Sequence, residues 1–397
     1  MPVHRPSFEV RDALQPSFTA WRIKVPAHRA GTGPARVVAR SIGTAGVALV
    51  RSLRHVLPFA DADIAALLFQ APSELIVGLE APQAAGIVQL LRDTGLDCDV
   101  VLGDQLIASG VGDHEVALSV RDVDKIPAVI VEVVKLLGVD VAAARGLVCN
   151  APAVLLGGIS TATVGALRAR FAPLGADLDA SRSADARFDL FLGECPAATR
   201  DRAVDRLRAA VGKLEITGAA GGPLVVPGLD HDTATRVWRE LRSADVPVRI
   251  VNRAFARYDV VLHAATDGDA LRRHLTDRVG MPPAVIPKVL ARLPIVIHRG
   301  LRHDELEAVL ADLAAADARV VAEPLAFQRF NLALGEVREV RPLIPVISAI
   351  AGIDEAAALT GLRARPPRIS GQFPPLQARW LQHELRRAGV DARLEAP

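Results

Sequence analysis

An internal repeat of about 70 residues constrains the fold of this chain more than any other feature of the sequence. One marker of the repeat is a glycine followed by an apolar residue, just before a polar residue and a helical pattern. It occurs at Gly78-Leu79, Gly158-Ile159, Gly228-Leu229, Gly300-Leu301 and, in degenerate form, Gln372-Phe373. A second marker ends the following helix with the same spacings of 80, 70, 72 and 72 residues, at Gly95, Gly175, Asp245, Asp317 and Gly389. Glycine is the favoured residue at a left-handed helix end, and Asp tolerates that conformation.

Each repeat has the pattern of three strands and three helices. Alternating apolar residues predict a first strand, at residues 21–25, 116–120, 190–192, 260–262 and 332–334. In the second repeat, helical periodicity covers 128–137 and 141–149, a short strand covers 154–156, and Ser160 caps a last helix. The order β-α-α-β-α-β predicts an α/β (α+β) fold class, in which each repeat is a three-stranded sheet with its helices on one face.

These markers divide the chain into an N-terminal extension and about five tandem domains. The third repeat is the most degenerate, because residues 212–222 are too rich in glycine for a good second helix. The predicted boundaries are 1–17 for the extension, and 18–102, 114–180, 187–252, 257–323 and 329–397 for the repeats.

Composition narrows the class of protein. The net charge is only +2, from 47 basic and 45 acidic residues, and aromatic residues make up 4% of the chain, so a nucleic-acid partner is disfavoured. No apolar run approaches the roughly twenty residues that span a bilayer, and the N-terminus lacks the apolar core of a signal peptide. These features predict a cytoplasmic protein with no membrane partner.

No constellation of catalytic or metal-binding residues is visible. Cys98, Cys149 and Cys195 form no Cys-x-x-Cys pair, which disfavours a disulfide framework or a zinc site, and the apolar-periodic stretches around Cys98 and Cys149 indicate core thiols. The glycine-rich stretches 31–34 and 157–161 lack the Gly-Lys-Ser/Thr ending of a phosphate loop. His298 and His303 are five residues apart, which does not place them on one helical face. The sequence therefore predicts no enzyme, no cofactor and no metal.

Residues 124–179 resemble the C-terminal globular domain of the bacterial ribosomal stalk protein, whose fold is similar to that of the Clp-protease adaptor. The stretches that carry the resemblance are Asp124-Lys125-Ile126-Pro127-Ala128-Val129-Ile130, Ala144-Arg145-Gly146-Leu147-Val148, Asn150-Ala151-Pro152 and Gly158-Ile159-Ser160. Residues 48–72 match the same helical pair in the first repeat, and the later repeats match more loosely.

The resemblance implies candidate partner-binding residues. In the stalk family this domain recruits translation GTPases through basic residues on its first two helices. Two of those basic positions fall on Arg51 and Arg54 in the first repeat but on Val131 and Val134 in the second. A third falls on Arg145 in the second repeat and on Ala65 in the first, so no repeat keeps the full set.

The leading hypothesis is a non-catalytic, multivalent protein-binding scaffold or adaptor, whose protein partner is a candidate GTPase or ATPase. One alternative is a ribosome- or RNA-associated factor that uses the basic first repeat, where Arg36 and Arg40 accompany Arg51 and Arg54. Another alternative is a structural repeat protein that acts by self-association.

Overall fold

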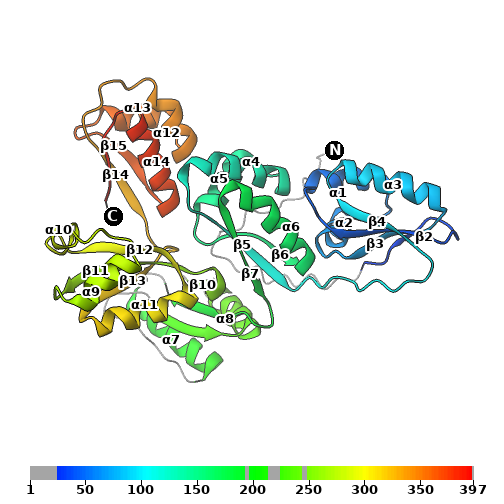
Figure 1. The fold of residues 1–397 in the computed structure, drawn as a ribbon, viewed down its shortest axis with the longest axis horizontal. Helices are drawn as coiled ribbons and strands as arrows, with labels where there is room; N and C mark the ends of the chain where they lie inside the picture. The colour runs from blue at the N-terminus through cyan, green and yellow to red at the C-terminus, as the bar shows by residue number, and fades with distance from the viewer. Residues whose placement is uncertain (1–24, 193–195, 213–223, 244–247, 396–397) are drawn as a thin grey trace. The chain divides into compact units, whose positions relative to one another are not determined.

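The computed structural model describes residues 25–192, 196–212, 224–243 and 248–395 (Figure 1). The chain divides into two compact units. The first contains most residues up to 250, and the second contains 149–152, 187–189 and the residues from 251 onward. Both units mix helices with small sheets, so the predicted α/β (α+β) fold class is confirmed.

Among the described residues there are five small sheets, and they share one strand order. The first long strand of each repeat lies between the last two strands, as in the orders β6-β5-β7 and β12-β11-β13. The central strands β2, β5, β11 and β14 are antiparallel to both of these neighbours. In the second repeat, α4, α5 and α6 lie together on one side of the sheet (Figure 1). Each repeat thus buries one sheet face beneath its helices.

The first repeat has an additional short strand. His28–Arg29 (β1) pairs in parallel with the edge strand β3. Residues 21–24, most of the predicted first strand, lie outside the described residues, and β2 occupies the central position instead. The other elements are β2 (Ala35–Ser41), α1 (Val47–Leu53), α2 (Asp61–Phe69), β3 (Ser73–Leu79), α3 (Ala81–Asp93) and β4 (Asp97–Leu102).

The second repeat follows the predicted pattern closely. Ser160 caps its last helix, because the side-chain oxygen accepts a hydrogen bond from the backbone N–H of Thr163. The buried face of that helix is formed by Val164, Leu167 and Phe171, as their spacing predicts. The elements are β5 (His114–Val120), η1 (Val123–Lys125), α4 (Ile126–Leu137), α5 (Val141–Cys149), β6 (Ala153–Ile159), α6 (Thr161–Phe171), η2 (Ala172–Leu174) and β7 (Ala176–Arg182).

The third repeat is described in part. The glycine-rich stretch that should weaken its second helix lies within 213–223, outside the described residues, and so does Cys195. Asp230 caps α8, because its side-chain oxygen accepts a hydrogen bond from the backbone N–H of Thr233 at 2.8 Å. The described elements are β8 (Phe188–Leu192), α7 (Ala197–Val211), β9 (Leu224–Leu229), α8 (His231–Ser243), β10 (Val248–Asn252) and η3 (Arg253–Phe255).

The fourth and fifth repeats have the same element order. The elements of the fourth are β11 (Arg257–Ala265), α9 (Asp269–Asp277), α10 (Ile286–Leu290), β12 (Ile295–Arg302), α11 (His303–Ala315) and β13 (Ala318–Pro324). Those of the fifth are β14 (Phe330–Leu334), α12 (Leu343–Ala351), α13 (Glu355–Arg363), β15 (Arg368–Phe373), α14 (Pro375–Arg387) and β16 (Ala392–Glu395).

Backbone geometry explains the glycine markers of the repeat. The turn glycine has a φ of 81°, 72°, 72° and 62° at Gly78, Gly158, Gly228 and Gly300, a region that side chains with a Cβ rarely adopt. In the fifth repeat Gly371, one residue before the predicted position, also has a positive φ, but at 124°. The X-Pro bonds before Pro72, Pro152, Pro294 and Pro366 are all cis, and these prolines keep the same register.

The second marker ends a helix in the left-handed region. Gly95, Gly175 and Gly389 have positive φ there, and Asp317 is the one described residue other than glycine with positive φ, at 53°. Asp245 lies outside the described residues. The requirement for positive φ accounts for both residue types at this position, because glycine pays no steric cost and Asp a small one.

Replacing Asp317 by glycine should stabilise the fourth repeat by about 0.5–1 kcal/mol, because glycine relieves the Cβ clash of the left-handed region. The weak hydrogen bond at 3.4 Å from Thr266 Oγ1 to Asp317 Oδ2 offsets little of this gain. Asp317→Val should destabilise the repeat, since a β-branched residue is disfavoured there. Hydrogen exchange of the β13 amides measures both effects. A destabilising Asp317→Gly would contradict this explanation of the marker.

No single helix in the described ranges is both long and apolar enough to cross a bilayer. The helices α12 and α13 pass a length and composition test only when they are taken together, and they are bent by 117° at the break between them.

Candidate functional site

The predicted partner-binding residues of the first repeat lie at the C-terminal end of α1. Arg51 is in the last turn of this helix and Arg54 is its C-cap residue, and both are exposed. Arg54 forms an ion pair with Asp61 at 3.4 Å, and the Arg54 side chain remains 66% exposed. An ion pair this open contributes little stability, so both guanidinium groups are accessible to a partner.

Arg145, the third predicted residue, lies on α5 of the second repeat and is half-buried. The two predicted groups therefore occupy the first helix of one repeat and the second helix of the next. Val131, at the position equivalent to Arg51, is 52% exposed on α4. The helical pair of the second repeat thus presents an apolar side chain where the first repeat presents a basic one.

Helix α1 packs against α4, which joins the first repeat to the second. The backbones approach closely because glycines stand at the contact. A Cβ on Gly46 would lie 2.3 Å from the carbonyl oxygen of Lys135, and one on Gly138 would lie 2.3 Å from Val47 Cγ1. The position of a Cβ on Gly138 is also only 3.6 Å from the Arg51 guanidinium. Arg51 therefore lies at the junction of the two repeats.

The beginning of α6 forms a second part of this junction. The Ser160 hydroxyl donates to the carbonyl oxygen of Ala71, and the Ser160 backbone N–H donates to the carbonyl oxygen of Phe69 at 3.1 Å. Ser160 therefore caps its own helix and holds the chain between α2 and β3 of the first repeat. The glycine-rich stretch 157–161 is thus a turn and helix cap rather than a phosphate loop. The backbone N–H groups of Ser160 and Thr163 at the start of α6 already donate to protein oxygens, those of Phe69 and Ser160.

Arg170 forms the buried centre of the junction. Its side chain is only 4% exposed, forms an ion pair with Glu132 on α4, and donates from Nη1 to the carbonyl oxygen of Ala45 at 2.7 Å. Burial raises the pKa of Glu132, but the hydrogen bond and charge of Arg170, with help from Lys135, outweigh burial and hold that pKa below 4.5. Two helices of the second repeat and a loop of the first are thus joined by one guanidinium group.

The connector between the repeats is also held. Gly110 donates from its backbone N–H to the carbonyl oxygen of Pro72 at 2.8 Å. A Cβ on Gly112 would lie 2.5 Å from the carbonyl oxygen of Gly158. In the first repeat the glycine-rich stretch 31–34 has a similar role, since a Cβ on Gly33 would lie 2.2 Å from the carbonyl oxygen of Leu79. Because glycine has no Cβ, the backbone can pack directly on the carbonyl groups of an edge strand. Packing therefore explains these glycines without a phosphate ligand.

Two of the basic residues in the first repeat are taken up by ion pairs within its sheet. Arg36 pairs with Glu74, and the Arg36 side chain is 17% exposed. Arg40 pairs with Asp99 at 3.0 Å. Of the four arginines Arg36, Arg40, Arg51 and Arg54, the last two are therefore the more accessible to a partner.

The two described cysteines are core residues, as predicted. Cys98 and Cys149 are buried, and neither is part of a disulfide. Burial, the largest effect, raises the pKa of the Cys98 thiol to about 11 from 9.0, although Arg92 lowers it slightly.

Native Cys98 should react with iodoacetamide at pH 7.5 at least about 100-fold more slowly than in the urea-unfolded chain, because a rise of two pKa units alone lowers the thiolate fraction by that factor. Mass spectrometry of the labelled peptides would measure the ratio. Equal rates in the native and unfolded chains would contradict the burial of this thiol.

His298 and the histidines at the starts of α8 and α11 have structural partners. His231 is the first residue of α8 and lies 3.2 Å from Asp232. His303 is the first residue of α11, and its Nδ1 lies 3.3 Å from the Tyr258 hydroxyl. Burial raises the pKa of Tyr258 to about 12, so this phenol stays protonated and is not a base at neutral pH. His298 contacts His274 rather than His303.

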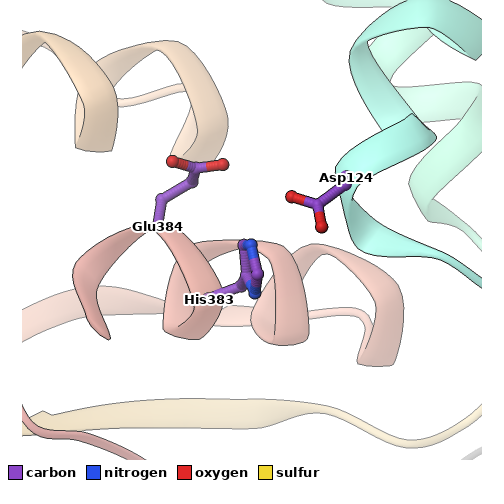
Figure 2. Close-up of side chains that lie close together, drawn as sticks. All are labelled: Asp124, His383 and Glu384. Carbon is purple, nitrogen blue, oxygen red and sulfur yellow. The ribbon is translucent and has the colours of Figure 1, made fainter. Parts of the chain in front are cut away.

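His383 and Glu384 are consecutive residues on α14, and Asp124 is in η1 (Figure 2). Asp124 belongs to the first compact unit, whereas the other two belong to the second. Within either unit alone, no three described His, Cys, Asp or Glu side chains converge as a metal site requires.

The sequence gives little sign of the residues that join the repeats. Arg170 looks like a polar-face residue beside Arg168, and Gly46 and Gly138 look like ordinary helix boundaries. The one usable signal was the Gly-Ile-Ser marker, which identified Ser160 as a cap but not as a contact with the preceding repeat. Comparison of the chain with protein-family models, with curated proteins and with solved structures finds no match.

Proposed function

We infer that this chain is a non-catalytic, multivalent scaffold or adaptor that binds protein partners. The observation that carries this proposal is the exposed, mixed surface of the first two helical pairs. Val56 of the first repeat is 68% exposed, Val131 and Val141 of the second are 52% and 62% exposed, and the exposed Arg51 and Arg54 belong to the first repeat. Exposed apolar residues together with accessible basic ones are typical of a protein-binding surface.

The junction between the first two repeats supports multivalency. Because α1 packs against α4, the two helical pairs are presented together in a fixed relation rather than as independent beads. A partner that contacts both pairs gains affinity without a further entropic cost of ordering the connector. The complementary partner is a protein segment with acidic and apolar side chains.

The ion pairs of Arg36 and Arg40 favour a protein partner over RNA. Both guanidinium groups are held by carboxylates of the same sheet, so fewer cations remain to neutralise a phosphate backbone. The resemblance to the ribosomal stalk domain agrees with recruitment as the role, and a GTPase or an ATPase is the first class of partner to test.

The test is affinity purification of the tagged full chain from its host, followed by mass spectrometry. Three variants are compared with wild type: Arg51→Glu/Arg54→Glu, Val131→Asp, and the control Arg202→Glu/Arg206→Glu, which makes the same charge change on exposed residues of α7. A partner retained by the control and lost by both other variants supports the proposal. Recovery of the chain alone, together with concentration-dependent light scattering, would favour self-association instead.

A partner lost from all three variants would show that net charge, rather than this surface, governs the interaction. Nuclease-sensitive recovery of ribosomal components would favour the RNA-associated alternative. Each outcome therefore selects a different function for the same surface.

A further inference from the structure

Two histidines face each other inside the fourth repeat. His274 on α9 and His298 on β12 have their Nε2 atoms 2.9 Å apart, and their ring planes are inclined by 77°. His274 is only 7% exposed, between the fully buried Leu271 and Leu275 of the same helix, and His298 is half-buried. This N–N distance is that of a hydrogen bond in which one ring donates and the other accepts.

The geometry fixes how many protons the pair can hold. Two neutral rings share one proton on the line between their Nε2 atoms. One imidazolium and one neutral ring also satisfy this line, because the charged ring donates and the neutral ring accepts. Two imidazolium rings do not, since both Nε2 atoms then carry hydrogens and the positive charges repel at contact distance. The second proton is therefore incompatible with the closed contact.

The charged groups around the pair fix the order of protonation. Asp312, on α11, favours the charged form of His274, whereas Arg278, which follows α9, opposes charge on both rings. Burial has the largest effect and lowers both pKa values, and His274 further lowers that of His298. The neighbouring strand β11 carries His263, whose Nε2 is buried without a hydrogen-bond partner in the described part of the chain. The first proton thus goes to His274, the ring whose charged form Asp312 favours.

The second repeat has a permanent charge pair at the equivalent position. Counted from the turn glycines Gly158 and Gly300, His274 and Asp312 stand where the second repeat has Glu132 and Arg170. Glutamate and arginine keep their charges throughout the range in which histidine titrates. The equivalent pair of helix positions therefore holds fixed charges in the second repeat and a titratable histidine in the fourth.

We propose that the fourth repeat is a proton-sensitive element, which opens between α9 and β12 when the His274–His298 pair takes up its second proton. Because the open state binds more protons than the closed one, the repeat loses stability as pH falls below the unfolded histidine value of about 6.5. The second repeat stays closed over the same range. Mild acidity then opens the fourth repeat and leaves the junction of the first two repeats unchanged.

Hydrogen exchange of the full chain between pH 7.5 and 5.0, corrected for intrinsic exchange rates, tests this proposal. Peptides covering α9 and β12 should lose protection by up to about tenfold per pH unit below pH 6, the slope of one extra proton. Peptides covering α4 and β6 of the second repeat are the internal reference and should not change. Equal responses in the two repeats would overturn the proposal.

Variants separate this pair from the other histidines of the repeat. In His298→Gln, the side-chain amide can donate to neutral His274 or accept from charged His274. The steep loss of hydrogen-exchange protection below pH 6 should therefore disappear in this variant. His263→Gln and His303→Gln should keep it, and its disappearance in either one would contradict the assignment. Carbon-13 NMR of the histidine rings in the wild-type chain gives an independent measurement. Two uncoupled titrations near pH 6.5 would overturn the proposal, and so would protection at pH 7.5 that rises with added Zn²⁺ and is reversed by EDTA.

Discussion

Arg170→Met should lower the local stability of the first two repeats by about 3 kcal/mol, because it leaves the mostly buried carboxylate of Glu132 without its main partner. The substitution also removes the donor to the carbonyl oxygen of Ala45. Lys135, 3.4 Å from Glu132, compensates in part, which places the effect at the low end of the range of about 3–5 kcal/mol for a broken buried pair. Protection of the α4 and α6 amides should fall by about 100-fold.

Arg168→Met is the matched control, because Arg168 is exposed on the same helix and its hydrogen bond at 3.2 Å to the carbonyl oxygen of Leu178 lies within the second repeat. It should change protection by less than about threefold. The double variant Glu132→Gln/Arg170→Met should recover part of the loss, since no buried charge then lacks a partner. Similar effects of Arg170→Met and Arg168→Met would contradict the assigned role of Arg170.

The Glu132–Arg170 ion pair should contribute less to stability as pH falls into the acidic range. The folded-state pKa of Glu132 lies below its ordinary value of 4.5, so the ion pair contributes its full stability above that value and loses it as pH falls through the lower, folded pKa. At pH 7 the contact is complete, and it remains so at pH 5.5, which is below the ordinary histidine value of about 6.5.

Gly46→Ala should destabilise the contact between the first two repeats by about 1–3 kcal/mol without unfolding either one. The added Cβ would lie 2.3 Å from the backbone carbonyl oxygen of Lys135, so α1 and α4 must move apart. Gly46 has a φ of −150°, which alanine adopts freely, so the effect is one of packing and not of backbone strain. Hydrogen exchange should increase in α1 and in the C-terminal half of α4, while β2 and β5 remain protected.

Gly86→Ala is the control, because a Cβ at this exposed position on α3 meets nothing within 4 Å. Alanine there should stabilise the helix by about 0.5–1 kcal/mol. Replacing glycine by alanine is thus expected to lower stability at position 46 and to raise it at position 86. If Gly46→Ala also stabilised the chain, the close approach of α1 and α4 would not be a constraint in solution.

The elements of the repeat could be predicted from the sequence because their signals are local. The apolar spacing of Val164, Leu167 and Phe171 defines a helix face, and Ser160 has the side chain that caps a helix. Asp317 could be grouped with Gly175 because both residue types tolerate positive φ. The first strand of the first repeat shows the limit of such signals, since β2 at Ala35–Ser41 has the central place that alternation assigned to residues 21–25.

The candidate site was predicted less completely. The resemblance identified Arg51 and Arg54 as basic positions, and both are exposed on the first helical pair. It could not show that Arg51 lies beside Gly138 of the next repeat, or that Arg36 and Arg40 are held by Glu74 and Asp99. An ion pair between residues distant in sequence leaves no periodic pattern in either segment.

By itself, the sequence determined the repeat, the element order and the α/β (α+β) class, because propensity, periodicity and turn geometry act over a few neighbouring residues. Only the tertiary structure decided which repeats join and which polar groups meet. Arg170 reaches Ala45 across 125 positions of chain, and His298 faces His274 rather than His303. The physical reason is that such contacts depend on how separate helices and sheets pack, and a solvent-exposed arginine or histidine has the same sequence signature as a buried, partnered one.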